Sequence, residues 1–243
     1  MTAVPRLYDV LHERIIRSVR TKGGISEKLF YETIRLGRKR LIGKTLWPHE
    51  LLLDLFLERA IRKKIQLRLG GKLKYFISGG AALNPEIGSF FMALGVKILQ
   101  GYGQTEASPV ISANRPNKIK IETVGPPVPG VEVKFAADGE ILVRGDLLMK
   151  GYWRDENSTA AAIQDGWLYT GDIGSMDEDG FITITGRKKE IIVNSGGENI
   201  VPTRVEALLT IEPEIEQAMV DGDQRPWLVA VIVPSSEARE EAQ

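Results

Sequence analysis

Apolar residues recur at helical spacing through the first 70 residues of the chain. A first amphipathic helix is predicted by residues three or four positions apart: Leu7, Val10, Leu11, Ile15 and Val19. The pair Gly23-Gly24 ends that helix, a second apolar run follows at residues 29–34, and Trp47-Pro48 interrupts it. A third helix is predicted from Leu51 to Ile65, apolar near its start and basic near its end, which suits the helix dipole. Gly70-Gly71 ends it, as glycine commonly does past a helix C-terminus.

The pattern then changes to that of a β–α–β unit. Residues 73–77 and 96–100 predict two strands. Between them, Asn84-Pro85-Glu86 predicts a helix start, because Asn caps, Pro fits the first helical position and Glu faces the positive end of the dipole. Gly95 should end this helix. Strands joined through a helix are parallel, so the loops Ser78-Gly79-Gly80 and Gly101-Tyr102-Gly103 should open on one edge of the sheet, where ligands of open α/β sheets bind.

Short strands with regular turns are predicted over residues 125–186. Alternating residues at 131–135 and 140–144 flank the hairpin signal Asp138-Gly139, and Asp179-Gly180 is a second such signal. This pattern of short strands and turns is typical of a small barrel or sandwich. Outside these hairpins the pattern predicts helices at 158–164 and 202–210, strands at 191–193 and 228–233, and an incomplete helix over 235–243.

Composition makes the chain an ordinary globular protein. It has 243 residues, of which 43% are hydrophobic and 26% charged. The absence of Cys excludes disulfides, thiolate metal sites and a Cys nucleophile. The sequence has no run of about 18 apolar residues, so no membrane-spanning helix is predicted. Charged residues near the start interrupt any signal-peptide pattern, so we expect a cytoplasmic location.

Charge is unevenly distributed although the formal net charge is zero. Residues 1–70 carry 16 Lys and Arg against 7 Asp and Glu, whereas the remaining residues carry 16 against 25. The excess of basic residues in the first 70 positions is explained either by solvated helix faces or by a surface that meets anionic lipid or ligand. Peripheral membrane association therefore stays open. The acidic balance elsewhere argues against nucleic-acid binding.

The segment Gly101-Tyr102-Gly103-Gln104-Thr105-Glu106 has the most informative chemistry. Its glycines let the backbone approach a flat ligand stacked on Tyr102, Thr105 offers a hydroxyl to a phosphate, and Glu106 offers a carboxylate oxygen to Mg²⁺. A tight turn at a sheet edge explains the same spacing equally well.

Three further segments carry candidate site residues, each with a plainer alternative. The turn Tyr169-Thr170-Gly171-Asp172 places a carboxylate where it can accept ribose hydroxyls, or simply caps a turn. Arg187 in Gly186-Arg187-Lys188-Lys189-Glu190 can bind a ribose or phosphate, or belong to a charged surface turn. The glycines of Asn194-Ser195-Gly196-Gly197-Glu198-Asn199 can border a narrow ligand, or form a plain loop.

In order and spacing these segments resemble the adenylate-forming enzyme family and, within it, the long-chain acyl-CoA synthetases. The likeness covers essentially the whole chain and includes Ser78-Gly79-Gly80-Ala81, Gly139 to Gly145 and Gly151-Tyr152-Trp153 besides the segments above. It implies an α/β fold: part of a βαβ-type sheet subdomain with helices, a small β-barrel-like subdomain, and the beginning of a small α+β C-terminal lid domain. The implied large AMP-binding part is 1–186 (1–72 helical, 73–124 α/β, 125–186 β-rich), followed by a hinge at 187–189 and the lid at 190–243.

The resemblance also implies a long-chain fatty acid–CoA ligase that converts ATP, fatty acid and coenzyme A into acyl-CoA, AMP and pyrophosphate. The implied nucleotide-binding residues are Gly79, Gly80, Ala81, Gly101, Tyr102, Gly103, Gln104, Thr105, Asp172 and Arg187. Thr105 and Glu106 would be catalytic, with Glu106 on Mg²⁺ and Lys189 as the hinge about which the lid rotates. Coenzyme A would contact the loop of Gly196, Gly197 and Glu198.

Two elements of that family do not occur in the sequence: a Gly/Ser/Thr-rich phosphate loop with a lysine, and a lysine near the C-terminus of the lid. We therefore expect a fragment that is severely impaired alone, with Met1 at an internal position of the longer protein and exposed edges on the strands at 73–77 and 96–100. A non-catalytic nucleotide-binding or interaction module, a fatty acyl-AMP ligase and an amino-acid-activating domain remain alternatives. Acyl chain length and a homo-oligomer are left open.

Overall fold

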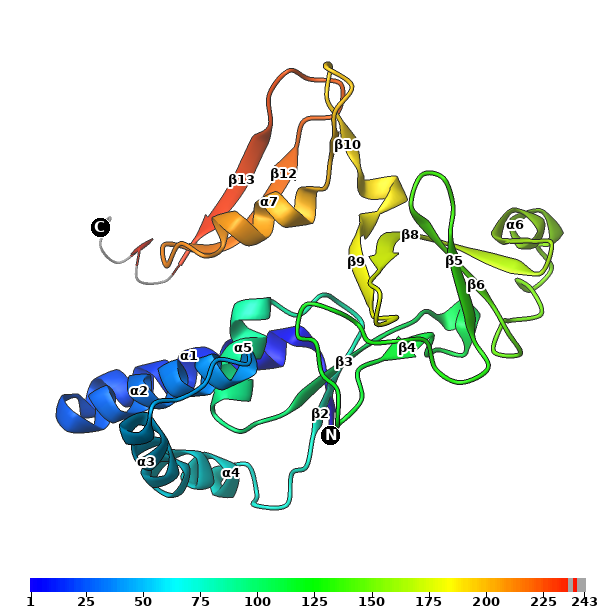
Figure 1. The fold of residues 1–243 in the computed structure, drawn as a ribbon. Helices are drawn as coiled ribbons and strands as arrows, with labels where there is room; N and C mark the ends of the chain where they lie inside the picture. Colours follow the sequence, from blue (N-terminus) through cyan, green and yellow to red (C-terminus); the bar gives the residue numbers. More distant parts are fainter. Residues whose placement is uncertain (236–237, 240–243) are drawn as a thin grey trace. The chain divides into compact units, whose positions relative to one another are not determined.

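A computed structural model describes residues 1–235 and 238–239, and the chain divides into two compact units (Figure 1). The first unit comprises Met1–Val131, Leu147–Met149 and Asp177–Ile182; the second comprises Glu132–Asp146, Lys150–Met176 and Thr183–Gln243. Most of the helix predicted over 235–243 lies outside the described residues.

Helices form most of the first 70 residues, as predicted. The helices of the first unit are α1 (Pro5–Lys22), α2 (Gly24–Leu41), α3 (Pro48–Leu57), the π-helical η1 (Glu58–Arg62), α4 (Lys63–Arg68), α5 (Pro85–Ala93) and the 3-10 helix η2 (Thr105–Ala107). Gly23 has a φ of 57° and donates its N–H to Val19 O at 3.1 Å, which ends α1. Pro48 opens α3, where the Trp47 N–H donates to Glu50 Oε2 at 3.1 Å. None of the described helices is both long enough and apolar enough to cross a bilayer.

Four short strands form the sheet of the first unit in the order β1-β2-β3-β4: β1 (Thr2–Ala3), β2 (Phe76–Ser78), β3 (Ile98–Tyr102) and β4 (Ser112–Ala113). The parallel pairing of β2 with β3 confirms the βαβ prediction, although both strands lie one to three residues further along the chain than predicted. The predicted exposed edges on these two strands are wrong. β1 pairs in parallel with β2 and β4 pairs antiparallel with β3, so both strands are interior. Two-residue strands give no periodic signal, which is why the sequence did not reveal them.

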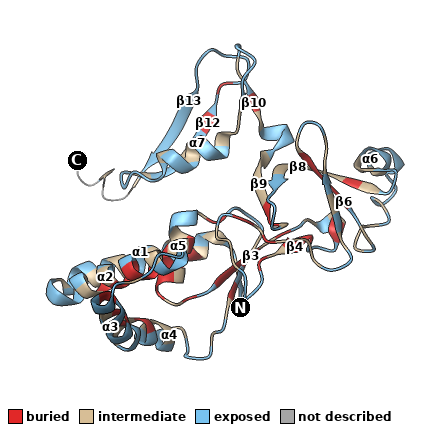
Figure 2. Cartoon of the chain, in the orientation of Figure 1, coloured by how far each residue is buried: buried red, intermediate tan, exposed pale blue. Residues whose placement is uncertain are grey.

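The main core of the first unit lies between its sheet and helices α1, α2 and α5. Figure 2 marks buried residues along α2, α5 and β3. The Tyr8 ring packs edge-on against Phe76 at 5.5 Å, and Phe90 packs edge-on against Phe91 at 5.3 Å. Gly37 on α2 allows close approach to Ala93, because a Cβ there would overlap the Ala93 backbone. This core holds β2 and β3, and therefore the loops at their carboxyl ends.

The second unit contains most of the remaining strands. Its elements are β5 (Glu132–Phe135), β6 (Glu140–Arg144), α6 (Glu156–Ala162), β7 (Ile163–Gln164), β8 (Trp167–Met176), β9 (Ile182–Arg187, entering from the first unit), the 3-10 helix η3 (Lys188–Glu190), β10 (Ile192–Val193), β11 (Asn199–Ile200), α7 (Pro202–Leu209), β12 (Ile215–Asp221) and β13 (Val229–Pro234). The predicted hairpin is the antiparallel pair β5–β6, part of a five-stranded sheet with β7, β8 and β9.

The strand β12 was not predicted. It pairs antiparallel with β13 and contacts α7, and the Val220 N–H donates to Glu206 Oε1 at 2.9 Å. Charged and polar residues occur throughout β12, so apolar and polar residues alternate only weakly along it. Its pairing with β13 and its contact with α7 identify it as a strand.

Candidate functional site

The carboxyl ends of β2 and β3 lie side by side and bring the first group of predicted site residues together. Ser78 is in register with Gln100, so the loop of Gly79, Gly80 and Ala81 runs beside the segment that starts at Gly101. A Cβ on Gly79 would lie 3.5 Å from Gly101 O, an ordinary contact. Gly80 has a φ of 85°, the left-handed region in which a side chain is strained. These loops form an edge on which a ligand can lie against backbone.

Glycine is required at position 103 for a reason internal to the protein. A Cβ there would overlap the carbonyl of Pro109. The chain folds back on itself at this point: Ala107 N donates to Gln104 O at 2.9 Å and Ile111 N donates to Tyr102 O at 2.8 Å. The tight turn, which was the alternative interpretation of these glycines, is therefore present. It holds Thr105 and Glu106 on η2.

Three side chains of this turn differ in their surroundings. Thr105 is exposed, and Glu106 is half-buried with its backbone oxygen accepting from Met149 N at 2.8 Å. Gln104 Nε2 is buried without a hydrogen-bond partner in the described part of the chain. A buried unpaired amide is costly, so a partner for this nitrogen would stabilise the turn.

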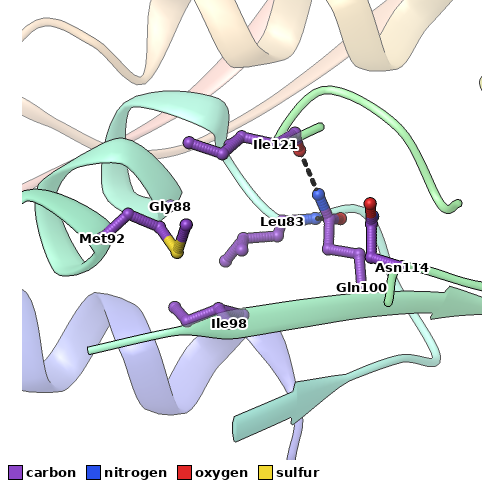
Figure 3. A pocket seen from close by; sticks show the side chains of 7 residues that line it. All are labelled: Leu83, Gly88, Met92, Ile98, Gln100, Asn114 and Ile121. Carbon is purple, nitrogen blue, oxygen red and sulfur yellow. Dashed lines mark hydrogen bonds between the residues drawn. The ribbon is translucent and has the colours of Figure 1, made fainter. Parts of the chain in front are cut away.

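A polar network beneath this loop was missed at the sequence level. Gln100 Nε2 donates to Ile121 O (Figure 3). Asn114 Nδ2 donates to Thr123 O at 2.7 Å. Lys120 N in turn donates to Asn114 Oδ1 at 3.0 Å. Gln100 and Asn114 are buried and fasten the loop of residues 118–124 to the sheet directly beside Gly101. Gln100, directly after the apolar run Ile98-Leu99, was the available signal in the sequence.

The hollow in Figure 3 belongs to this packing. It is lined by Leu83, Gly88, Met92, Ile98, Gln100, Asn114 and Ile121. The space between these side chains has no room for a water molecule, so it serves as packing under the loop.

The turn predicted before Asp172 lies inside strand β8, as an irregularity in its pairing with β6, and hydrogen bonds hold it from several directions. Thr170 Oγ1 donates to Ile141 O at 2.7 Å, and Asp172 N donates to Thr170 Oγ1 at 3.1 Å. Gly171 N donates to Glu140 Oε1 at 2.9 Å. Arg187 Nε donates to Asp172 Oδ1 at 3.1 Å, so the structure brings together the two residues predicted to hold a ribose.

Glu140 links this turn to the start of η3 and was not singled out from the sequence. It is buried, and its second carboxylate oxygen accepts from Lys188 Nζ at 2.8 Å. Asp138 also pairs with Lys188. The hydrogen bond that Lys188 donates to Asp138, and then the one that it donates to Glu140, raise the pKa of Lys188. The bond from Lys188 also lowers the pKa of Asp138. The sequence did not reveal this role of Glu140. The turn signal Asp138-Gly139 identifies Glu140 only as the first residue of the next strand.

The other predicted residues of the second unit lie beyond Lys188. Lys189 is exposed on η3. Gly196, Gly197 and Glu198 form the loop between β10 and β11, in which Asn194 Oδ1 accepts from the N–H groups of Gly196 and Glu198, both at 2.9 Å. Gly197 has a φ of 80°, which favours glycine. The loop is thus ordered by its own asparagine.

Two family models match the chain. Residues 1–153 match the model described as AMP-binding enzyme, and residues 189–243 match the model described as AMP-binding enzyme C-terminal domain.

Curated relatives carry the names of fatty-acid ligases. Long-chain-fatty-acid–CoA ligase FadD15 of Mycobacterium bovis is 47% identical over 183 residues, covering 75% of this chain and 30% of that protein. Long chain acyl-CoA synthetase 6, peroxisomal, of Arabidopsis thaliana is 36% identical over 249 residues, covering 95% of this chain and 34% of that protein. The chain therefore spans about a third of the length of the curated relatives it matches.

Solved structures of adenylate-forming enzymes have the same fold. The o-succinylbenzoate CoA synthetase of Bacillus subtilis in complex with the acyl-adenylate intermediate OSB-AMP matches with a TM-score of 0.62 and 27% identity, over 74% of this chain and 43% of that chain. The amide bond synthetase McbA of Marinactinospora thermotolerans matches with a TM-score of 0.59 and 34% identity, over 67% of this chain and 37% of that chain. The predicted α/β fold class is confirmed.

Proposed function

The chain belongs to the AMP-binding enzyme family, and from that membership we propose that it is the part of a long-chain fatty acid–CoA ligase that holds adenylate, metal and coenzyme A. The observation that carries the proposal is the segment Gly101 to Glu106, fixed at the carboxyl edge of β2 and β3. The substrate class follows from the names of the relatives at 47% and 36% identity.

Nucleotide binding is the role that the first unit's loops support best. Gly79, Gly80 and Ala81 run beside Gly101, so their backbone can lie flat against a purine. Tyr102, the proposed stacking partner, is only 9% exposed, so just an edge of its ring can meet the purine. Gln104 Nε2 supplies a donor that the described residues leave unpaired, and Thr105 offers an exposed hydroxyl to the α-phosphate. Turn 103–110 fixes these groups in advance of binding, which lowers the entropy lost on binding.

Ribose recognition is assigned to Asp172 and Arg187. A carboxylate accepts hydrogen bonds from both hydroxyls of a ribose, and Asp172 is fixed by the turn that Thr170 and Glu140 hold. The Arg187 guanidinium, whose side chain is 64% exposed, keeps donors for a ribose or phosphate oxygen while its Nε bonds Asp172.

Glu106 fits a magnesium site in its chemistry. A carboxylate is a hard oxygen ligand, and Mg²⁺ in phosphate-transfer sites is commonly held by one or two carboxylates plus substrate phosphates and water. Bound there, Mg²⁺ would neutralise charge on the phosphates of ATP. The chain's own contribution is to hold that carboxylate on η2, whose position is fixed by the bond from Met149 N to Glu106 O.

Coenzyme A is assigned to the loop of Gly196, Gly197 and Glu198, and Lys189 to the hinge. The match of residues 189–243 to a separate C-terminal domain model supports a boundary at this point. We therefore retain 1–186 as the larger AMP-binding part, 187–189 as hinge and 190–243 as lid. Lys188, which lies within this proposed hinge, pairs with Asp138 and Glu140.

ATP–pyrophosphate exchange with palmitate tests the proposal, measured on this chain and on a longer polypeptide that contains it. We expect exchange by the longer polypeptide and its loss in the Glu106→Ala variant, with Glu13→Ala, an exposed glutamate on α1, as control. No exchange by either polypeptide with any fatty acid would contradict the proposal. Exchange that Glu106→Ala leaves unchanged would remove Glu106 from the metal site.

A further inference from the structure

Two loops of the second unit lie side by side at the end of strand β10 (Figure 1). The 194–198 loop joins β10 to β11 and contains the glycines to which coenzyme A is assigned, and the 222–228 loop joins β12 to β13. Val193, the last residue of β10, donates its N–H to Asp223 Oδ1 at 3.0 Å. Its carbonyl oxygen accepts from Gln224 N at 2.8 Å. The 222–228 loop therefore bonds both backbone groups of the residue that precedes the 194–198 loop.

A third hydrogen bond extends this contact into the 194–198 loop itself, where Ser195 N donates to Arg225 O at 3.1 Å. The remaining bonds of the loop are its own. Asn194 accepts two of its N–H groups, and Asn194 Nδ2 donates to Glu198 Oε2 at 2.8 Å. The asparagine therefore sets the shape of the loop, whereas the neighbouring loop sets where that shape lies.

The 222–228 loop adopts a strained turn at this contact. Arg225 N donates to Gly222 O at 3.0 Å, which closes a four-residue turn. Gln224, the third residue of that turn, has a φ of 58°, where glycine or asparagine is the usual residue. Strain of this kind persists only where the surrounding structure enforces it. Here the strained residue is the one whose N–H donates to Val193 O.

The sheet that carries the 222–228 loop belongs to the body of the proposed lid. β12 and β13 pair antiparallel, and β12 packs on α7, with a hydrogen bond from Val220 to Glu206. The 194–198 loop is therefore attached to this body through the 222–228 loop as well as through its own chain ends. Two attachments restrict the positions that the loop can take relative to α7 and β12.

We propose that Asp223 is a positioning residue for coenzyme A: its carboxylate fastens the 194–198 loop to the 222–228 loop, so that the backbone of Gly196 and Gly197 has one conformation before coenzyme A arrives. The inference rests on the proposed function, which assigns coenzyme A to that loop. Without the carboxylate the loop must become ordered on binding, and the entropy of ordering weakens the affinity. Asp223 is exposed, so its loss should open the loop locally rather than unfold the unit.

Electrostatics alone predicts the opposite effect of removing Asp223. Coenzyme A carries negative phosphates, so the loss of a carboxylate near its loop should strengthen binding. Weaker binding after Asp223→Ala therefore identifies a positioning role and not a charge effect. Asp221→Ala is the matched control, because Asp221 is an exposed aspartate at the end of β12 and its replacement makes the same change in charge.

Thioester formation and ATP–pyrophosphate exchange, measured in a longer polypeptide that contains this chain, test the proposal. We expect Asp223→Ala to raise the KM for coenzyme A about tenfold and to leave exchange within about twofold of the parent, because adenylation does not use coenzyme A. Asp223→Asn should restore most of the KM, since an amide oxygen still accepts from Val193 N. Asp221→Ala should give a KM at or below that of the parent, within about twofold.

Amide hydrogen exchange on the chain itself gives a readout that needs no ligand. The Val193 N–H should exchange about tenfold faster in Asp223→Ala than in the parent, because the loop opens more often. Asp221→Ala should keep the parent's rate. An unchanged rate at Val193 in Asp223→Ala would show that the carboxylate does not hold the loop, and the inference would be wrong.

Gly197→Val is the reference for the ligand, because a branched side chain at a φ of 80° distorts the loop to which coenzyme A is assigned. A KM raised by Gly197→Val but not by Asp223→Ala would overturn the positioning role and leave the coenzyme A site standing. A KM that neither variant changes would remove coenzyme A from this loop and the inference with it. Equal loss of exchange and thioester formation in Asp223→Ala would reveal general damage, which also contradicts a role confined to coenzyme A.

Discussion

The guanidinium of Arg62 lies 2.8 Å from a carboxylate oxygen of Asp54, and both side chains are almost fully buried. Arg62 also donates to Ala93 O at 2.8 Å and to Thr33 O at 3.2 Å, so one side chain joins η1 to α3, α5 and α2. A buried ion pair is tolerable only when its remaining donors are bonded, as they are here. This connection fixes the orientation of α3.

Replacing Asp54 by Ala should destabilise the chain by about 3 kcal/mol or more, because Arg62 would keep a buried charge without its carboxylate partner. Glu58→Ala is the control: it removes a half-exposed partner of the same Arg62 and should cost less than about 1 kcal/mol. Urea unfolding gives both free energies. Equal losses in the two variants would show that burial of the pair is irrelevant to its effect.

Acid should destabilise the first unit partly through Glu50. The hydrogen bond from Lys39, followed by that from the Trp47 N–H, lowers the pKa of Glu50 to about 2. Because the folded pKa is below the unfolded one of about 4.3, its contribution is present above about pH 5 and is lost as the pH falls toward 2. Urea midpoints measured from pH 6 down to pH 2 should fall less steeply for Glu50→Gln than for the parent. Glu122→Gln, an exposed control, should keep the parent's slope; identical slopes in all three proteins would contradict the assignment.

Gly103→Ala should destabilise the chain by about 1 to 3 kcal/mol, since the added methyl would overlap the Pro109 carbonyl and force the turn apart. The matched change Gly79→Ala meets Gly101 O at an ordinary 3.5 Å and should cost under about 1 kcal/mol. Chemical denaturation measures both. A Gly103→Ala protein as stable as the Gly79→Ala protein would mean that the turn adopts another conformation.

Glu140 should affect nucleotide binding without touching the nucleotide. Glu140→Ala removes the acceptor of the Gly171 N–H and should raise the dissociation constant for AMP about tenfold, equivalent to about 1.4 kcal/mol, in a longer polypeptide that contains this chain. Glu140→Gln should restore most of the affinity, because an amide oxygen still accepts that hydrogen bond. Isothermal titration calorimetry checks both variants.

Asp138→Asn is the control for the Glu140 experiment, because Asp138 shares the contact with Lys188 but makes none with Gly171. It should leave AMP affinity within about twofold of the parent. A tenfold loss in Asp138→Asn as well would assign the effect to Lys188 rather than to the Asp172 turn.

Local signals were enough to predict many elements. Asn84-Pro85-Glu86 predicted the start of α5 correctly, with Asn84 Oδ1 accepting from Glu86 N at 2.9 Å, and Asp138-Gly139 predicted the β5–β6 hairpin. Local sequence signals did not predict β1, β4 and β12, because these strands depend on pairing with other parts of the chain. The exposed edges predicted for β2 and β3 were wrong for this reason.

The sequence by itself determined the family and most helices and longer strands, and it proposed the candidate site residues, since helix caps, turn glycines and motif spacing are local properties of the chain. Only the tertiary structure decided that Glu140 holds the Asp172 turn, that Gln100 and Asn114 fasten a loop beside Gly101, and that α3 turns Leu52 and Leu55 outward. Each of these depends on which charges and amides meet after folding. Hydrophobic periodicity shows that a helix has two faces, but the ion pairs of Asp54 and Glu50 decide which face is inside.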